Sequence, residues 1–349
     1  MIKILHSADW HMDSPIQGRT TEQTALLRQS LLRLPQLITA AAVTQGCDLM
    51  VLSGDLFDGP ATPESVAALR SALEEFGRPV FIAPGNHDPL TAASVWHSQI
   101  WPKNVHIFSP ALECVEMPHY RVYGAAFTTA ESHSLLADFQ IQPASKPAIG
   151  VFHGDPTQAN SPYSPITAEQ VSNSGLDYLA LGHIHKGGSF RTGKTLCAWP
   201  GCPMGRGFDE LDEKGVLIVT LDDSGAQSQF LPLHTPRFYD WECSGEPAEA
   251  LGRLLPAVGN YDFYRITFTG ECEPPNLEAL QMQFSHFPNL ILRDRTVPPL
   301  NVWETADRDS LEGVYFSLLR NQLEENRENA ELAARISRQI LEGLEVELP

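Results

Sequence analysis

Short, β-rich apolar runs alternate with helical stretches through roughly the first 230 residues of the chain. Alternation of this kind predicts a layered α/β domain, in which the runs form strands and the stretches between them form helices. We expect strands at residues 2–6, 48–53, 79–83, 119–127, 148–153, 178–182 and 215–221.

The segment between the first two expected strands, residues 22–45, has apolar residues at helical spacing. Pro35 lies inside it and should kink or divide the helix, because proline lacks the backbone N–H that an internal helical position needs.

The sheet pattern ends in a proline-containing connection at residues 232–239, which we take as a domain boundary. Beyond it, strands are expected at 261–268 and 290–293. Helices are expected at 246–255 and 276–284, and the four elements together suit a compact α+β domain.

The last segment is predicted to form two amphipathic helices, because its apolar residues recur three or four positions apart on both sides of a polar turn at 324–329. The pattern as a whole predicts a large α/β domain of residues 1–235, a small α+β capping domain of residues 236–305 and a C-terminal helical arm of residues 306–349.

Composition limits the class of protein. Of the 349 residues, 42% are hydrophobic and 19% charged, and no apolar run approaches the roughly 18 residues that would span a bilayer. The N-terminal residues lack the basic and apolar stretches of an export signal, so a cytoplasmic protein is expected. The six cysteines are scattered without a CxxC pair, which favours free thiols.

The formal net charge of −19 argues against broad electrostatic wrapping of a polyanion, since nucleic-acid binders usually carry a basic face. Bound divalent cations would reverse the field at a local site, and a partner could supply a basic surface.

Five short motifs lie at or just after the ends of expected strands, where open α/β sheets place their ligands. Their carboxylate, amide and imidazole groups suit manganese, iron or zinc better than a thiolate site would. The motifs are DWH at 9–11, GDLFD at 54–58, GNHD at 85–88, HG at 153–154 and GHIH at 182–185.

Spacing within the motifs supports one metal centre. In an extended segment residues i and i+2 point the same way, so Asp9 can converge with His11, and His183 with His185. Glycines at 54, 85 and 182 allow tight turns at the strand ends. A lone histidine is usually a surface or core residue, which is how we interpret His97, His106, His119, His133, His234 and His286.

The order of the motifs resembles the calcineurin-like metallophosphoesterase superfamily, whose α/β fold is a sandwich of two mostly parallel sheets flanked by helices. GDLFD, and GHIHKGG followed by AWPGCPMGRGFDE at 198–210, resemble the bacterial SbcD-type branch of DNA double-strand-break repair exonucleases. The resemblance covers the whole of the large domain and, more weakly, the cap. It implies that the large domain is a nuclease domain.

The resemblance implies two divalent metal ions, manganese being expected and iron, zinc or magnesium the alternatives. Asp55 would bridge them. Carried over motif by motif, it assigns one ion to Asp9, His11, Asp55 and His185 and the other to Asp55, Asn86, His153 and His183.

The resemblance leaves His87 free of metal, as a proton donor to the leaving oxygen or a stabiliser of charge in the transition state. We expect Asp88 to orient His87, because a carboxylate behind an imidazole fixes its tautomer. Asp58 and Asp155 receive no role from the sequence.

The function implied is hydrolysis of DNA by a metal-dependent exonuclease in DNA repair, working with an SbcC-type ATPase. The alternative is a phosphodiesterase or phosphatase acting on a small molecule or nucleotide, which the acidic charge favours. A scaffold without activity ranks last, because all the expected ligands are present. The sequence leaves the oligomeric state open, a homodimer included.

The C-terminal helix pair has two interpretations. It is a docking arm for the ATPase, or it packs within its own chain, which is the commoner fate of an amphipathic helix. As an arm, it would use Leu311, Tyr315, Leu318, Leu332, Ile336 and Ile340 as anchors, with Arg320, Arg327, Arg335 and Arg338 at the rim.

Overall fold

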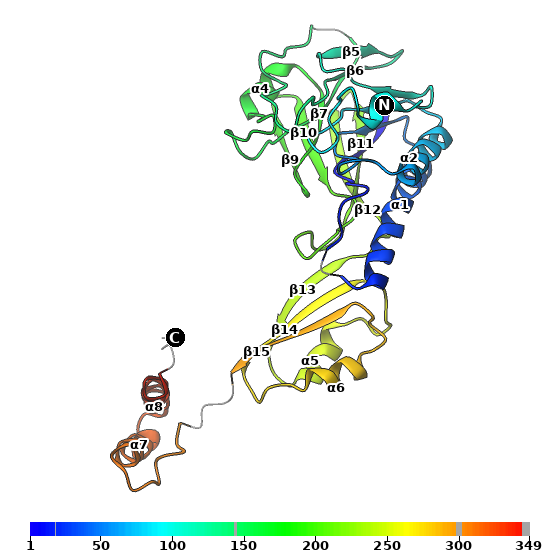
Figure 1. The fold of residues 1–349 in the computed structure, drawn as a ribbon. Coiled ribbons are helices and arrows are strands. Elements are labelled where there is room, and N and C mark those ends of the chain that lie inside the picture. The colour runs from blue at the N-terminus through cyan, green and yellow to red at the C-terminus, as the bar shows by residue number, and fades with distance from the viewer. Residues whose placement is uncertain (18, 143–144, 298–301, 344–349) are drawn as a thin grey trace. The chain divides into compact units, whose positions relative to one another are not determined.

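The structure is a computed structural model that describes residues 1–17, 19–142, 145–297 and 302–343 (Figure 1). It divides into two compact units, Met1–Tyr239 with Tyr261–Phe263 and Asp240–Asn260 with Tyr264–Pro349. The finer division into a cap and a C-terminal arm stays a prediction, and residues 344–349 lie outside the described part. No helix in that part is both long and apolar enough for a membrane span.

The first unit contains a mixed sheet with the strand order β12-β11-β1-β2-β3-β4. Strands β1 to β4 are parallel, and β11 and β12 extend the sheet in antiparallel fashion. The strands are β1 (Ile2–Ser7), β2 (Leu49–Leu52), β3 (Val80–Ile82), β4 (Val105–Ile107), β11 (Gly215–Asp222) and β12 (Gly225–Pro232).

A second sheet in the same unit has the order β5-β6-β7-β8-β10-β9. Its four inner strands are parallel, and the edge strands β5 and β9 are antiparallel to their neighbours. The strands are β5 (Glu113–Glu116), β6 (Arg121–Gly124), β7 (Ala148–His153), β8 (Tyr178–Gly182), β9 (Lys186–Thr192) and β10 (Thr195–Gly201).

Buried apolar side chains of both sheets form one cluster, so the sheets pack face to face. Ile4 and Val51 come from the first sheet and Val151 and Tyr178 from the second. Helices α1 (Thr21–Thr44) and α2 (Pro63–Phe76) lie side by side over the outer face of the first sheet (Figure 1). Helix α4 (Ala168–Ser174) contributes to the core on the outer face of the second. The expected two-sheet sandwich is confirmed.

Helix α1 begins at a capping box, in which the Thr20 side chain accepts from the backbone N–H of Gln23 and Gln23 caps Thr20 in return. Of the two expected effects of Pro35, a kink or a division, the division is wrong, since α1 runs unbroken past it. Leu34 and Ile38, on either side of the proline, are fully buried. Burial of this face offsets the one hydrogen bond that Pro35 removes.

The second unit contains a three-stranded sheet with β14 at its centre. It also contains a helix pair with a small core of its own, in which Phe316 and Ala334 are fully buried. The six cysteines are unpaired, as expected. The elements are β13 (Phe238–Cys243), α5 (Pro247–Leu254), β14 (Phe263–Glu271), α6 (Leu277–Gln283), β15 (Leu290–Val297), α7 (Leu311–Asn321), η1 (Gln322–Glu324) and α8 (Arg327–Glu342).

Candidate metal centre

The seven expected ligands meet at the carboxyl ends of five parallel strands, three in the first sheet and two in the second. Parallel strands end at the same edge of a sheet, so residues far apart in the chain come together there. The ligands follow β1 (Asp9 and His11), β2 (Asp55), β3 (Asn86) and β8 (His183 and His185) or end β7 (His153).

One group of side chains gathers around His11 and His185. The Nε2 atoms of the two rings are 3.0 Å apart, and the ligand atoms of Asp9, His11 and His185 all lie within 4.8 Å of one another. Imidazole nitrogens that face each other so closely beside a carboxylate have the arrangement of ligands to one cation.

The second group gathers around the amide oxygen of Asn86. Its Oδ1 atom lies 2.9 Å from His153 Nε2 and 3.2 Å from His183 Nδ1. Asp55 faces both groups, because its Oδ2 atom is 3.3 Å from His153 Nε2 and 3.8 Å from His11 Nε2. One carboxylate oxygen is therefore shared between two sets of ligands.

The hydrogen bonds of the Asp9 carboxylate indicate whether a cation would fit between these side chains. Its Oδ1 atom accepts the backbone N–H of His183 at 2.8 Å, whereas Oδ2 is buried and receives no hydrogen bond from the described residues. A buried carboxylate oxygen without a donor is costly unless a cation neutralises it. Oxygen and imidazole donors also suit hard or borderline divalent ions. The residues fit two such ions.

Hydrogen bonds on the outer side of the ligands fix their orientation. His153 Nδ1 donates to the carbonyl oxygen of Ser53 at 2.8 Å, so Nε2 is the nitrogen that points into the centre. His185 Nδ1 donates to Glu210 Oε1 at 2.7 Å, which turns its Nε2 inward in the same way.

The electrostatics reflect concentrated negative charge. Burial alone would lower the pKa of His153, but the carboxylates of Asp55 and Asp9 outweigh it and raise that pKa to about 9. Burial would likewise raise the pKa of Asp55, yet His153 and His11 hold it well below its usual range. The protein thus gathers positive charge around these carboxylates, and divalent cations would supply the same neutralisation.

The backbone at the ligands is unusual. Asp9, His11, Asp55 and His183 have φ angles of 56°, 46°, 52° and 99°, in the left-handed region that most residues avoid. Gly85 serves a different purpose from the tight turn expected of it, because a Cβ atom there would lie 2.2 Å from Asp55 Oδ1. It is glycine because the Asp55 carboxylate needs that space.

His87 stands beside the two ligand groups. Its Nδ1 atom is 2.9 Å from Asp58 Oδ1, its side chain is 44% exposed, and no described residue bonds to its Nε2 atom. The backbone N–H of His87 donates to Asp55 Oδ1 at 2.8 Å, which ties the position of His87 to that of Asp55.

The expectation that Asp88 orients His87 is wrong, and Asp58 occupies that place. The Asp88 carboxylate accepts the backbone N–H groups of Gly85, Leu56, Phe57 and Asp55 at 2.8 to 3.2 Å. Burial, with the nearby charge of Asp55, raises its pKa to about 7. Asp88 therefore ties the GNHD turn to the GDLFD loop.

Arg206 and Glu210 are functional candidates that the motif analysis missed. Arg206 Nη2 donates to Glu210 Oε1 at 2.6 Å, and Nη1 lies 3.9 Å from Asp58 Oδ2. Arg206 thus lies between Glu210, which bonds to His185, and Asp58, which bonds to His87. The signal was present in the GRGFDE stretch at 205–210, which follows the last histidine motif.

Asp155, whose role the sequence left open, makes local bonds. Its Oδ1 atom accepts from the backbone N–H and hydroxyl of Thr157 at 2.8 and 2.6 Å. Asp155 shapes the turn that follows His153.

Glu210→Gln is expected to weaken metal binding by about 10- to 100-fold, as loss of such outer hydrogen bonds typically does. The amide cannot match the carboxylate that receives both the His185 ring and Arg206. Titration of the variant with manganese measures its affinity for the metal. Glu213→Gln, which removes the same charge at an exposed position, is the control. Equal affinity in the two variants would contradict the assignment.

Comparison with known proteins decides the family. The sequence model of the calcineurin-like phosphoesterase family matches residues 2–187 of this chain, a range that contains all five motifs. The chain belongs to this family. As a calcineurin-like phosphoesterase it is a metal-dependent hydrolase.

Curated relatives of this phosphoesterase include nucleases. The chain is 29% identical over 255 residues to the uncharacterized metallophosphoesterase YhaO of Bacillus subtilis, covering 67% of this chain and 60% of YhaO. It is 26% identical over 265 residues to the D component of the nuclease SbcCD of Bacillus subtilis, covering 62% and 66%. It is 23% identical over 222 residues to the DNA double-strand break repair protein Mre11 of Aeropyrum pernix, covering 58% and 53%. The matched part thus spans less than two thirds of each relative.

Proposed function

We propose that this phosphoesterase hydrolyses phosphodiester bonds of DNA, in DNA repair, through two divalent ions, with manganese as the expected metal. The observation that carries the proposal is the position of Asp55 Oδ2 between two groups of ligands, with the exposed ring of His87 beside them. DNA as the substrate is supported by the relatives named as a nuclease component and as a DNA break repair protein.

The ligand sets of the proposal follow the two groups. Asp9, His11 and His185 would hold one ion, Asn86, His153 and His183 the other, and Asp55 would bridge them. When bound, the ions supply a nucleophile from water at neutral pH and neutralise charge on the phosphate.

His87 would act on the leaving side. Hydrolysis adds water to phosphorus and breaks one P–O ester bond, and the departing oxygen needs a proton. No described residue bonds to Nε2 of His87, which would donate that proton, while Asp58 holds Nδ1. Arg206 near Asp58 would limit how far that carboxylate moves.

Hydrolysis of a small phosphodiester is the second candidate, favoured by the net charge of −19. The test offers the manganese-loaded protein linear duplex DNA, single-stranded DNA and an aryl phosphodiester. Release of nucleotides from DNA supports the first candidate. If only the aryl diester is hydrolysed, and DNA is not cleaved even when an SbcC-type ATPase is added, the second candidate is supported.

We also propose that helices α7 and α8 dock an SbcC-type ATPase. Leu311, Leu318 and Ile340 are 88%, 61% and 62% exposed, which leaves an apolar surface on a hairpin whose core is already filled by Phe316. The rim arginines expected to meet the partner instead pair with acidic residues of their own chain, as Arg320 does with Asp307. Docking would then depend mainly on the apolar surface.

Deleting the chain after Thr305 is expected to abolish capture of the ATPase while metal-dependent hydrolysis of an aryl phosphodiester continues. The helix pair packs around its own small core, so its loss leaves the two-sheet unit intact. Co-purification and turnover measure the two effects.

A point variant separates docking from folding. Leu318→Glu should reduce capture, whereas Leu112→Glu, at a 46% exposed position of the first unit, should not. Full capture by the truncated chain, or loss of hydrolysis with the helix pair, would contradict the docking proposal.

A further inference from the structure

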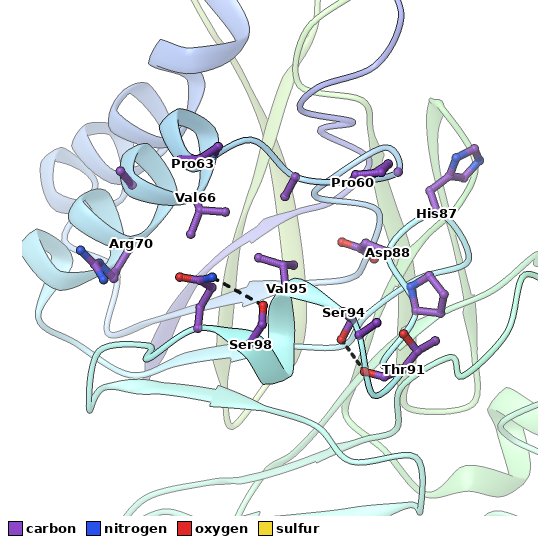
Figure 2. A pocket seen from close by; sticks show the side chains of 16 residues that line it. Pro60, Pro63, Val66, Arg70, His87, Asp88, Thr91, Ser94, Val95 and Ser98 are labelled. Carbon is purple, nitrogen blue, oxygen red and sulfur yellow. Dashed lines mark hydrogen bonds between the residues drawn. The ribbon is translucent and has the colours of Figure 1, made fainter.

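A groove of about 560 Å³ runs away from the metal centre and begins at His87 (Figure 2). One wall is the loop before helix α2 and the first turns of that helix, including Pro63, Val66 and Arg70. The facing wall is the segment from Pro89 through α3 (Val95–Ser98). Figure 2 places His87 at one end and Arg70 at the other. The volume falls within the roughly 300 to 1,000 Å³ typical of small-ligand sites.

The middle of the groove is mainly apolar. Pro60, Pro63, Pro89, Val66 and Val95 line it, and the hydroxyl-bearing residues Thr91, Ser94 and Ser98 follow one side. Apolar surface with a few polar groups at its margin is the usual character of a site for an organic ring system. A nucleoside has that character, with a flat base and a hydroxyl-rich sugar.

Arg70 is the one exposed charged side chain among the Asp, Glu, Lys and Arg residues that line the groove, whereas the whole chain has a net charge of −19. Asp88 is the one acidic residue among those that line it, and its carboxylate is buried and committed to backbone N–H groups. Arg70 is exposed, and no described residue forms an ion pair or hydrogen bond with its side chain. An unpaired guanidinium at the end of an apolar groove favours an anionic group such as a phosphate.

We infer that the groove binds the nucleoside that departs from the scissile bond, and that Arg70 contacts the next phosphate of the strand. The inference rests on the proposed function. His87 would protonate the leaving oxygen, so the part of the substrate attached to that oxygen lies on the His87 side of the centre, where the groove begins. The groove thereby selects a polynucleotide over a simple diester.

The test uses dinucleotides, since the distal phosphate can be added or left out. The manganese-loaded protein is given thymidylyl-thymidine without a terminal phosphate, with a 5′-phosphate or with a 3′-phosphate, and a bis-aryl phosphodiester. Chromatography of the products identifies which nucleoside leaves as a free hydroxyl. The isomer whose extra phosphate is on that nucleoside should have kcat/KM roughly tenfold above the unphosphorylated substrate, the effect of one charge-assisted contact. The other isomer should show no gain.

Variants of Arg70 show whether this residue causes the rise in kcat/KM that the extra phosphate gives. Arg70→Gln should remove it, and Arg70→Lys should keep most of it. Both should hydrolyse the aryl diester at the rate of the unmodified protein. Arg33→Gln, which removes an exposed charge from α1, should behave as the unmodified protein with every substrate. Melting temperatures check that the variants are folded.

The outcomes separate the two proposals. Cleavage of DNA and dinucleotides with no gain from the distal phosphate, or with a gain that survives Arg70→Gln, overturns the groove assignment and leaves the nuclease proposal standing. Turnover of the aryl diester without cleavage of any dinucleotide or DNA, in the presence of the ATPase as well as in its absence, overturns both.

Discussion

Replacing Asp55 with alanine is expected to remove bound metal from both sites and to lower hydrolysis of an aryl phosphodiester by about 10³-fold or more. Asp55 Oδ2 lies 3.3 Å from His153 Nε2 and 3.8 Å from His11 Nε2, so one substitution takes a ligand from each group. Metal ions contribute several kcal/mol of charge stabilisation to such reactions, and each 1.36 kcal/mol is a factor of ten in rate.

Elemental analysis of the purified Asp55→Ala variant, together with its rate at saturating manganese, measures both effects. Asp223→Ala removes the same charge at an exposed turn and should retain two ions and the full rate. Asp55 also accepts the backbone N–H of His87, so circular dichroism is needed to show that the variant is folded. Two ions per chain at unchanged affinity would refute the bridging role.

Replacing His87 with alanine is expected to leave the metal content nearly intact and to lower turnover of DNA by about 10² to 10⁴-fold, the usual contribution of general acid–base catalysis. The loss should be much smaller for a nitrophenyl diester, because nitrophenolate departs without a proton. This dependence on the leaving group is a signature that a purely structural role of His87 would not produce.

A rival role for His87 is ligation, since its ring lies within 4.8 Å of ligand atoms of His11 and Asp58. Metal analysis of His87→Ala distinguishes the two, because a ligand would take its ion with it. His97→Ala, at an exposed position on α3, is the matched control. An equal loss of rate on both substrates would argue against proton donation.

Two strands with both faces buried, β7 and β8, were predicted well, although the almost equally buried β10 was missed. Every residue of β7 and β8 is buried, and the apolar runs at 148–153 and 178–182 gave their bounds correctly. Strands β9 and β12 were missed because most of their residues are exposed and at least half of them are polar or glycine, so their sequences lack a clear apolar signal. Strand β9 pairs with β10 and β12 pairs with β11, so these two strands are specified by their neighbours in the sheet and not by their own apolar pattern.

The residues that converge in the site could be predicted, because each lies in a motif at a strand end and parallel strands bring those ends together. Their partners could not. Asp88 is adjacent to His87 in sequence, yet the turn directs its carboxylate under the GDLFD loop, and Asp58 comes from another strand end to meet the ring. Glu210 reaches His185 from 25 residues away, a distance that no local pattern encodes.

The left-handed backbone at Asp9, His11, Asp55 and His183 has an evolutionary consequence. Each such residue costs about 1 kcal/mol or more in the folded state, whether or not the protein ever meets a substrate. Mutation to glycine at these positions would relieve that cost. In a lineage that stopped using the site, the backbone at these positions would therefore favour glycine over the present residues.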